Sequence, residues 1–154
     1  NDMVTLKLFG YWYSDQEPYY PHPGLFIDEN FDPEIKDWVI RYLKFSFPVH
    51  HYRGFSFCRF NCGDTPPGTS DNSDGEFIFP SGFIHYVEKH HVKPPQEFID
   101  KVIKNIPLII QIEEDEKNVA KKLLRKKEDD QRSMAEYEVD YHWWEATFKE
   151  KKLT

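Results

Sequence analysis

Proline and glycine divide this chain into short segments, and this division limits the folds that it can adopt. The 154 residues include 11 prolines and 7 glycines. Three prolines and one glycine fall within residues 14–24, SDQEPYYPHPG, which predicts a surface loop. Proline ends helices and removes a hydrogen bond from a sheet, so we expect short regular elements between such breaks.

Aromatic residues supply the apolar bulk for a core. They make up 17% of the chain, against 31% charged residues, and they are spread along its length. Burial of so many rings offsets the conformational entropy that is lost on folding. The chain length also suits one ordinary domain, so we expect residues 1–154 to fold as a single domain.

Three segments have the apolar spacing of amphipathic helices. Residues 33–43 follow Asp32, a residue type that caps helices, and their apolar side chains fall on one helical face. Residues 82–92 predict a second helix with Ser81 as its cap, and residues 95–106 predict a third.

Other segments are rich in β-branched and aromatic residues and predict strands. The stretch 135–143 alternates apolar and polar residues, as a half-buried strand does. We therefore expect an α+β fold, in which a small antiparallel sheet packs against two or three helices. Residues 113–132 are mostly charged and predict a further, solvated helix. The expected strands are residues 4–13, the cysteine-bearing stretch 49–60, residues 76–80 and residues 135–143.

The two cysteines and two of the seven histidines form the strongest candidate site. Three residues separate Cys58 from Cys62, and His85 and His90 follow on the second expected helix. Thiolates at a turn and imidazoles on a following helix can surround a tetrahedral zinc ion. We predict a structural zinc bound by Cys58, Cys62, His85 and His90, with His91 as an alternative fourth ligand.

The spacing of these residues differs from common zinc patterns in three ways, the first of which is the gap of 22 residues between Cys62 and His85, longer than in zinc fingers. The usual separation of the cysteines is two residues, and His85 and His90 point about 140° apart on an ideal helix. His90 joins the site only where the helix unwinds, which Pro94 favours. Two other interpretations stay open. The cysteines are either small buried hydrophobic residues or a redox-active dithiol.

Acidic residues between the expected strands suggest two weaker sites. Residues 69–77, TSDNSDGEF, have the composition of a calcium loop, but Ser81 stands where an EF-hand requires glutamate, so we expect a polar turn. An acid and base set forms only if this loop folds over the following helix. Its members are Asp71, Asp74, Glu76 and His85.

Two further stretches have alternative interpretations. His50 and His51 beside Arg53 resemble an anion site, yet neighbouring residues on a strand point to opposite faces of the sheet. The aromatic stretch YHWW, residues 141–144, is either part of the core or a binding surface, and core packing is the commoner role.

The charge of the chain restricts its partners. The formal net charge of −7 argues against a general affinity for nucleic acid or for anionic lipid. No window approaches 18 uninterrupted apolar residues, the first residues lack the features of a secretion signal, and two close cysteines do not form a secreted disulfide framework. We expect a cytoplasmic protein that binds another protein rather than nucleic acid or membrane.

The stretches FSFCRFNCG, residues 55–63, and SDGEFIFPSGFIHYVEKHH, residues 73–91, carry a recognisable motif. It resembles the pattern Cys-Arg-x-x-Cys-Gly, then Asp-Gly-x-x-x-Trp-Pro-x-Gly-x-x-His-Tyr-Val-x-x-His, of a widespread family of small uncharacterised bacterial proteins. The resemblance covers residues 10–103 and leaves residues 108–154 as a C-terminal extension. Phe79 stands where the family has tryptophan. The matching residues are Cys58, Arg59, Cys62, Gly63, Ser73, Asp74, Gly75, Pro80, Gly82, His85, Tyr86, Val87, His90, Val92, Pro95 and Phe98.

The resemblance implies no particular activity, but it does imply a joint role for the cysteine pair and the two histidines. Our first hypothesis is a protein-interaction or regulatory module, stabilised by zinc, rather than an enzyme. One alternative is a hydrolase that uses zinc or the set Asp74, His85 and His90. The other is an acidic inhibitor, similar to an immunity protein or antitoxin, whose charge opposes a basic partner.

Overall fold

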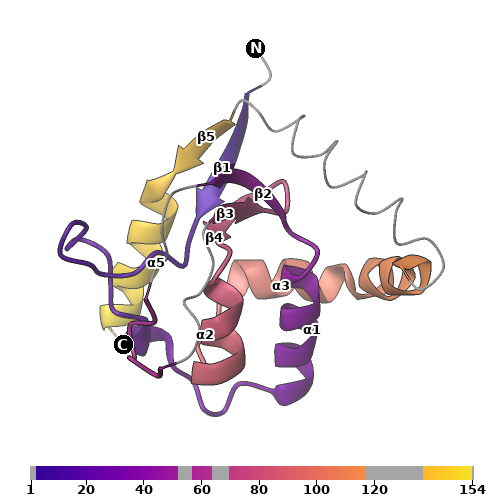
Figure 1. Ribbon diagram of the computed structural model, residues 1–154, viewed down its shortest axis with the longest axis horizontal. Helices are drawn as coiled ribbons and strands as arrows, with labels where there is room; N and C mark the ends of the chain where they lie inside the picture. The colour runs from indigo at the N-terminus through magenta and orange to yellow at the C-terminus, as the bar shows by residue number, and fades with distance from the viewer. Residues whose placement is uncertain (1–2, 52–56, 64–69, 117–136, 154) are drawn as a thin grey trace.

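The computed structural model describes residues 3–51, 57–63, 70–116 and 137–153, and these residues form an α+β fold (Figure 1). The predicted fold class is confirmed. Among the described residues, no helix has the length and apolar character that crossing a bilayer requires. The elements in chain order are β1 (Val4–Leu8), the short 3-10 helix η1 (Pro23–Phe26), α1 (Pro33–Leu43), β2 (Phe47–His51), β3 (Ser70–Ser73), β4 (Phe77–Pro80), α2 (Phe83–His90), α3 (Gln96–Lys104), β5 (Tyr137–Asp140) and α5 (Tyr141–Leu153).

The five strands form one sheet in the order β2-β3-β4-β1-β5. β2, β3 and β4 pair antiparallel, whereas β1 lies parallel to both of its neighbours, β4 and β5. The sheet is therefore mixed and not wholly antiparallel. Parallel neighbours need long connections, and here these connections carry the helices. In Figure 1, α1, α2 and α3 gather beside one part of the sheet, and α5 runs along β1 and η1.

The first predicted helix is confirmed as α1, and its N-terminus is capped as expected. The Asp32 carboxylate accepts a hydrogen bond from the Glu34 amide at 2.9 Å, and Pro33 occupies the first helical position. The expected cap of the second helix is wrong, because α2 begins after Gly82 without a side-chain cap. The Ser81 hydroxyl instead accepts a hydrogen bond from the Ser70 amide at 3.3 Å, and so joins the ends of β3 and β4.

Of the strand predicted over 135–143, residues Tyr137–Asp140 are confirmed, residues 141–143 are helical instead, and residues 135–136 lie outside the described residues. α5 begins at Tyr141, where the Asp140 carboxylate accepts a hydrogen bond from the Trp143 amide at 3.1 Å and acts as a cap. Helical geometry places Trp144 and Phe148 on one face, and both are buried. Burial of that pair outweighs the alternating pattern of the sequence.

Other differences concern the ends of elements. β1 stops at Leu8, shortly before Gly10 with its φ of +81°, and among the described residues of the cysteine-bearing stretch only 49–51, the end of β2, form strand. Residues 52–56 of that expected strand lie outside the described residues. Residues 113–116, the first part of the charged helix expected over 113–132, belong to a helical stretch, 106–116, and residues 117–132 lie outside the described residues.

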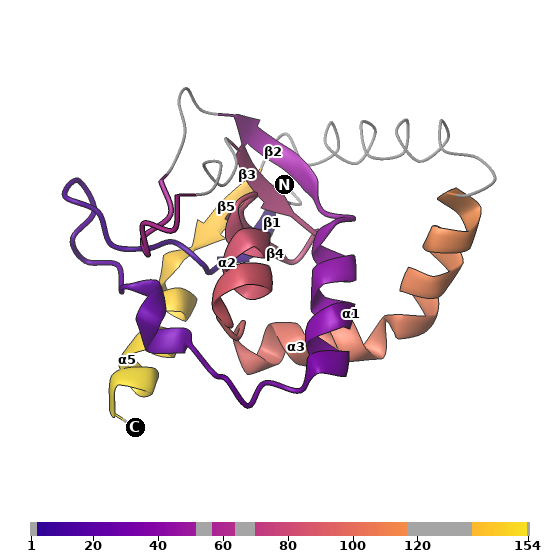
Figure 2. The same ribbon diagram turned by 60° about the horizontal axis from the view of Figure 1, so that its bottom comes forward.

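The core is built around the ring of Phe9, at the end of β1, which has no exposed surface. Its ring centroid lies 4.9 Å from that of Phe98 on α3, 5.1 Å from Phe83 on α2 and 6.5 Å from Trp144 on α5. Phe9 thus links the sheet to three helices, whose arrangement around the sheet is visible in Figure 2.

Gly10 allows this packing, and its replacement tests it. Gly10 has a φ of +81°, and a Cβ atom there would lie 2.6 Å from Phe83 Cδ1, whereas Gly75, with a φ of +100°, has open space at that position. We expect Gly75→Ala to lower the free energy of unfolding by about 1–2 kcal/mol through backbone strain. Gly10→Ala should lose a further 1–3 kcal/mol, roughly, because the ring must move. Urea unfolding of both variants measures this difference, and equal losses would contradict the packing argument.

Candidate metal centre

Two segments that are distant in sequence bring four metal-binding side chains together. Cys58 and Cys62 come from the short stretch 57–63, and His85 and His90 come from α2. One ligand atom from each of the four lies within 4.8 Å of all the others. The predicted set is therefore close enough to bind one metal ion, and its ligands are compatible with zinc.

The paired distances match tetrahedral coordination. The sulfur of Cys58 lies 3.3 Å from His90 Nε2, and the sulfur of Cys62 lies 3.5 Å from His85 Nε2. Zinc bonds of roughly 2.3 Å to sulfur and 2.0–2.1 Å to nitrogen place the two atoms about 3.5 Å apart in a tetrahedron. Each sulfur–nitrogen pair is thus already near the separation that a shared ion requires.

The end of α2 explains how two histidines five residues apart reach the same site. His85 lies in the first turn of the helix, and His90 is its last residue. The next residue, His91, adopts a left-handed conformation with a φ of 56°, and its amide donates to the Tyr86 carbonyl. His90 is still part of α2, so the expected unwinding at His90 is wrong, and the ring centroids of His85 and His90 are nevertheless 5.0 Å apart.

His91, the alternative ligand, lies outside the set. Its Nδ1 atom is 3.4 Å from the Lys36 ammonium on α1, and its side chain is exposed. Because the chain turns at His91, adjacent imidazoles diverge, and only His90 points to the cysteines.

The cysteines lie on a turn rather than on a strand. The Asn61 amide donates to the Cys58 carbonyl at 3.0 Å, and Asn61 and Gly63 have φ angles of 51° and 82°. This reversal compensates for the three residues that separate Cys58 from Cys62, because it returns the second sulfur toward the first. The longer spacing is therefore compatible with a shared ion.

Arg59 and Tyr86 hold this turn against α2. The Arg59 amide donates to the Tyr86 hydroxyl at 3.0 Å, and the Arg59 guanidinium donates to the Tyr13 carbonyl at 2.7 Å. The ring of Phe60 also packs 4.5 Å from that of His90. Periodicity did not single out these supporting residues, although Arg59 and Tyr86 belong to the motif that carries the family resemblance.

The four ligands differ in exposure. Cys58 is 7% exposed and belongs to the core cluster, whereas Cys62 is exposed and both histidines are half-buried. The interpretation of both cysteines as buried hydrophobic residues therefore fits Cys58 only. One side of the site rests on the core, and the other faces solvent.

The acid and base set predicted around His85 is not brought together among the described residues. The buried Asp74 carboxylate accepts from the Tyr42 hydroxyl at 2.6 Å and pairs with Lys101 at 3.0 Å, while Asp71 pairs with His50 at 3.3 Å. Glu76 also pairs with Lys101, at 3.2 Å.

The remaining weak candidates have structural explanations. Residues Ser70–Ser73 of the calcium-like stretch form β3, which the sequence analysis missed. His50 and His51 are both exposed on β2, and Arg53 is outside the described residues. In the aromatic stretch 141–144, Trp144 is a core residue, as its commoner role predicts.

Comparison of the chain with protein-family models, curated proteins and solved structures finds no match. The resemblance to the bacterial family therefore stays a prediction, and the chemistry of the site rests on its own geometry.

The two adjacent histidines provide a matched test of the ligand set. We expect His90→Ala to lose tightly bound zinc, because one of four ligands is removed, and His91→Ala to keep about one zinc per chain. Elemental analysis after gel filtration, with a zinc-binding dye as a second assay, measures the content. Loss of zinc from both variants, or from neither, would show that the ligand set is assigned incorrectly.

The hydroxyl of Tyr86 gives the fold a dependence on alkaline pH. Burial raises the pKa of Tyr86 to about 12, from an ordinary value of about 10. Between these values the unfolded chain loses the phenolic proton and the folded chain keeps it, so the free energy of unfolding falls as pH rises. We expect Tyr86→Phe to show a weaker decline than the original protein in urea titrations between pH 9 and 11. Parallel declines would show that Tyr86 does not contribute.

Proposed function

We propose that this protein binds one zinc ion with Cys58, Cys62, His85 and His90, and that the ion has a structural role. The observation that carries the proposal is the convergence of the four ligand atoms within 4.8 Å. In the proposed state, zinc fixes the turn 57–63 to α2. The protein then acts by binding another protein, not by catalysis.

The types of ligand favour zinc over other common metals. Two thiolates and two imidazoles form one of the standard structural zinc sets, whereas calcium and magnesium take oxygen ligands. Copper competes for the same ligands, so the choice of metal depends on which ion is available and on the coordination geometry. A tetrahedral arrangement of two sulfur and two nitrogen ligands favours zinc. The four-coordinate geometry proposed here suits zinc, which has no preference of its own from d electrons.

A structural role follows from the number of ligands. Catalytic zinc usually keeps three protein ligands and one position for water or substrate, whereas four protein ligands close the coordination sphere. Asp74, the acid of the alternative hydrolase set, contacts Tyr42 and Lys101. The hydrolase is therefore the less supported alternative, and the inhibitor role rests on the net charge of −7 alone.

The turn 57–63 is the part of the protein that the proposed ion stabilises. Its side chains contact the rest of the protein mainly through Arg59 and through aromatic rings, and it contains no helix or strand. A metal ion that binds only the folded protein adds a stabilisation that grows with its free concentration. Apart from Cys58, the core cluster is built from residues outside this turn, so we expect the protein without metal to keep its fold at lower stability.

Removal of the metal tests the structural role. We expect a strong chelator to lower the free energy of unfolding by about 4 kcal/mol relative to free zinc at a thousandfold excess over its Kd, and zinc to restore it. Cys62→Ser should be as unstable as the chelated protein and insensitive to chelator, whereas His91→Ala should respond as the original protein does.

The same samples separate the structural role from catalysis. A Cys62→Ser variant that still binds zinc at full occupancy, and that hydrolyses activated esters, would support an open catalytic site. Unchanged stability of the original protein in chelator, with no zinc in elemental analysis, would refute zinc binding.

A further inference from the structure

A shallow hollow lined by tyrosines lies on the sheet, and its residues are not among the metal ligands. We call it the tyrosine surface, and its volume is about 550 Å³. It is formed by β1, by the loop before η1, by β5 and by the start of α5. The lining residues are Leu8, Tyr19, Tyr20, Val139 and Tyr141.

The rings of the tyrosine surface pack against one another and stay partly open to solvent. The ring centroid of Tyr19 lies 4.7 Å from that of Tyr20 and 6.0 Å from that of Tyr141. Tyr19 is 55% exposed and Val139 is 42% exposed. A group of mutually supported aromatic rings that is not covered offers a preorganised contact surface, because little side-chain entropy remains to be lost.

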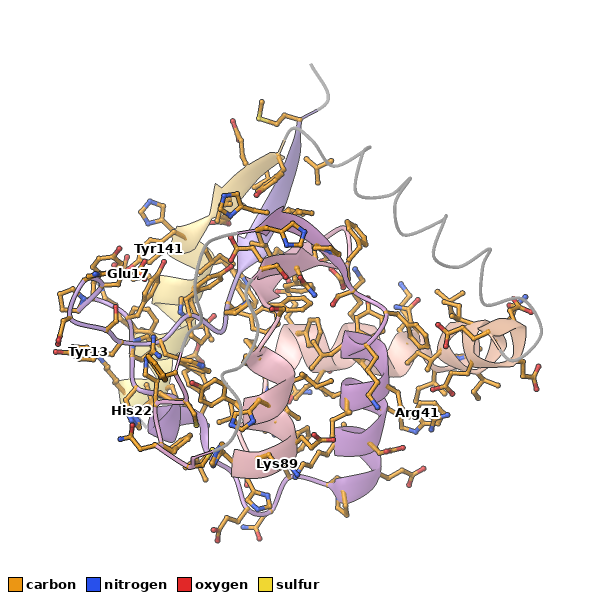
Figure 3. The ribbon with its side chains drawn as sticks, viewed as in Figure 1. Tyr13, Glu17, His22, Arg41, Lys89 and Tyr141 are labelled. Atoms are coloured by element: carbon orange, nitrogen blue, oxygen red, sulfur yellow. The ribbon has the colours of Figure 1, made fainter. Side chains whose placement is uncertain are left out.

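Carboxylates surround these rings. The charge of Glu17 acts on Tyr20, Figure 3 labels Glu17 and Tyr141 in the same region of the view, and Glu145 lies one helical turn after Tyr141 on α5. Burial is the main cause that raises the pKa of Tyr20, and the charges of Glu17 and other neighbours, including Asp71, raise it further. Burial also raises the pKa of Tyr141, and the charge of Glu145 is the next cause. The nearest lysine on α5, Lys149, pairs with Glu145 at 3.6 Å. The carboxylates whose charges act on Tyr20 and Tyr141 are therefore Glu17, Asp71 and Glu145, and Glu145 also contacts His142 at 3.8 Å.

This combination of rings and charge selects a cationic occupant. The face of a tyrosine ring attracts ammonium and guanidinium groups, and neighbouring carboxylates strengthen that attraction. A second copy of the chain fits poorly, because it carries the same net charge of −7 and would bring the same carboxylates into contact. A shallow surface also suits an extended segment with several cationic side chains better than a small ligand that needs enclosure.

We propose that the tyrosine surface docks a lysine- or arginine-bearing segment of a partner protein, with cationic side chains over the rings of Tyr19 and Tyr141 and near the carboxylate of Glu17. This inference rests on the proposed protein-binding role and adds the chemistry of the partner. It does not depend on the metal, whose ligands are a different set of residues.

The test uses two labelled peptides, one in which lysine alternates with alanine and one in which glutamate replaces lysine. We expect the lysine peptide to bind saturably in fluorescence anisotropy and the glutamate peptide not to bind. Tyr19→Ala should weaken binding about 2- to 5-fold, the effect of one exposed cation–π contact. Glu17→Gln should weaken it as well and reduce its dependence on salt.

Two control variants remove an exposed apolar side chain and an exposed carboxylate elsewhere. Leu108→Ala removes an apolar side chain that is 48% exposed, and Glu29→Gln removes an exposed charge near α1. We expect both to bind the lysine peptide as the original protein does. If Glu29→Gln weakens binding as much as Glu17→Gln, or if Tyr19→Ala has no effect, attraction is diffuse and the proposal is wrong. A dimer that Tyr19→Ala dissociates would also overturn it, in favour of a second copy.

Zinc content measured on the same samples separates this inference from the metal proposal. Binding that depends on Tyr19 in a protein without zinc would support the tyrosine surface and reject the metal site. A zinc-loaded protein that does not bind the lysine peptide would reject the tyrosine surface and leave the metal site supported.

Discussion

The packing of aromatic side chains around Phe9 is the interaction on which the rest of the structure depends. Phe9 follows β1, which lies between β4 and β5 in the sheet, and its ring contacts those of Phe83, Phe98 and Trp144, one on each of three helices. Helices of eight or nine residues, such as α2 and α3, are too short to be stable alone in water. They form here because the sheet and the rings bury their apolar faces.

This packing also decides where the metal ligands lie. Phe83, Tyr86 and Val87 anchor α2 in the core, which leaves His85 and His90 half-buried and facing the turn 57–63. Tyr86 has a double role, because its ring lies in the core while its hydroxyl accepts from the Arg59 amide. The position of the cysteines thus follows from an aromatic residue between the two histidines, and the site is an extension of the core toward solvent.

Local chemistry in the sequence was sufficient to predict α1 and the four cysteine and histidine side chains that the fold brings together, but not the arrangement of the sheet. Asp32 and Pro33 define a helix start by themselves. β3 has the sequence SDNS, which has low strand propensity, and it forms because β2 and β4 pair with it on both sides. The parallel pairing of β1 arises from contacts across the chain that no local pattern encodes. The supporting role of Arg59 equally depends on where α2 lies.

The pairing of β1 with β5 has a consequence for how the chain folds. Val4 pairs with Tyr137, and the indole of Trp144 donates to the carbonyl of Tyr11, 133 residues earlier. Contacts of such high sequence separation form slowly, because a long loop must close before they stabilise anything. During synthesis, β1 leaves the ribosome long before β5 exists. The edge of β1 that pairs with β5 in the folded protein is therefore unpaired during that time. Unpaired strand edges are sites of aggregation, so the edge of β1 that later pairs with β5 stays open to such pairing until β5 is synthesised.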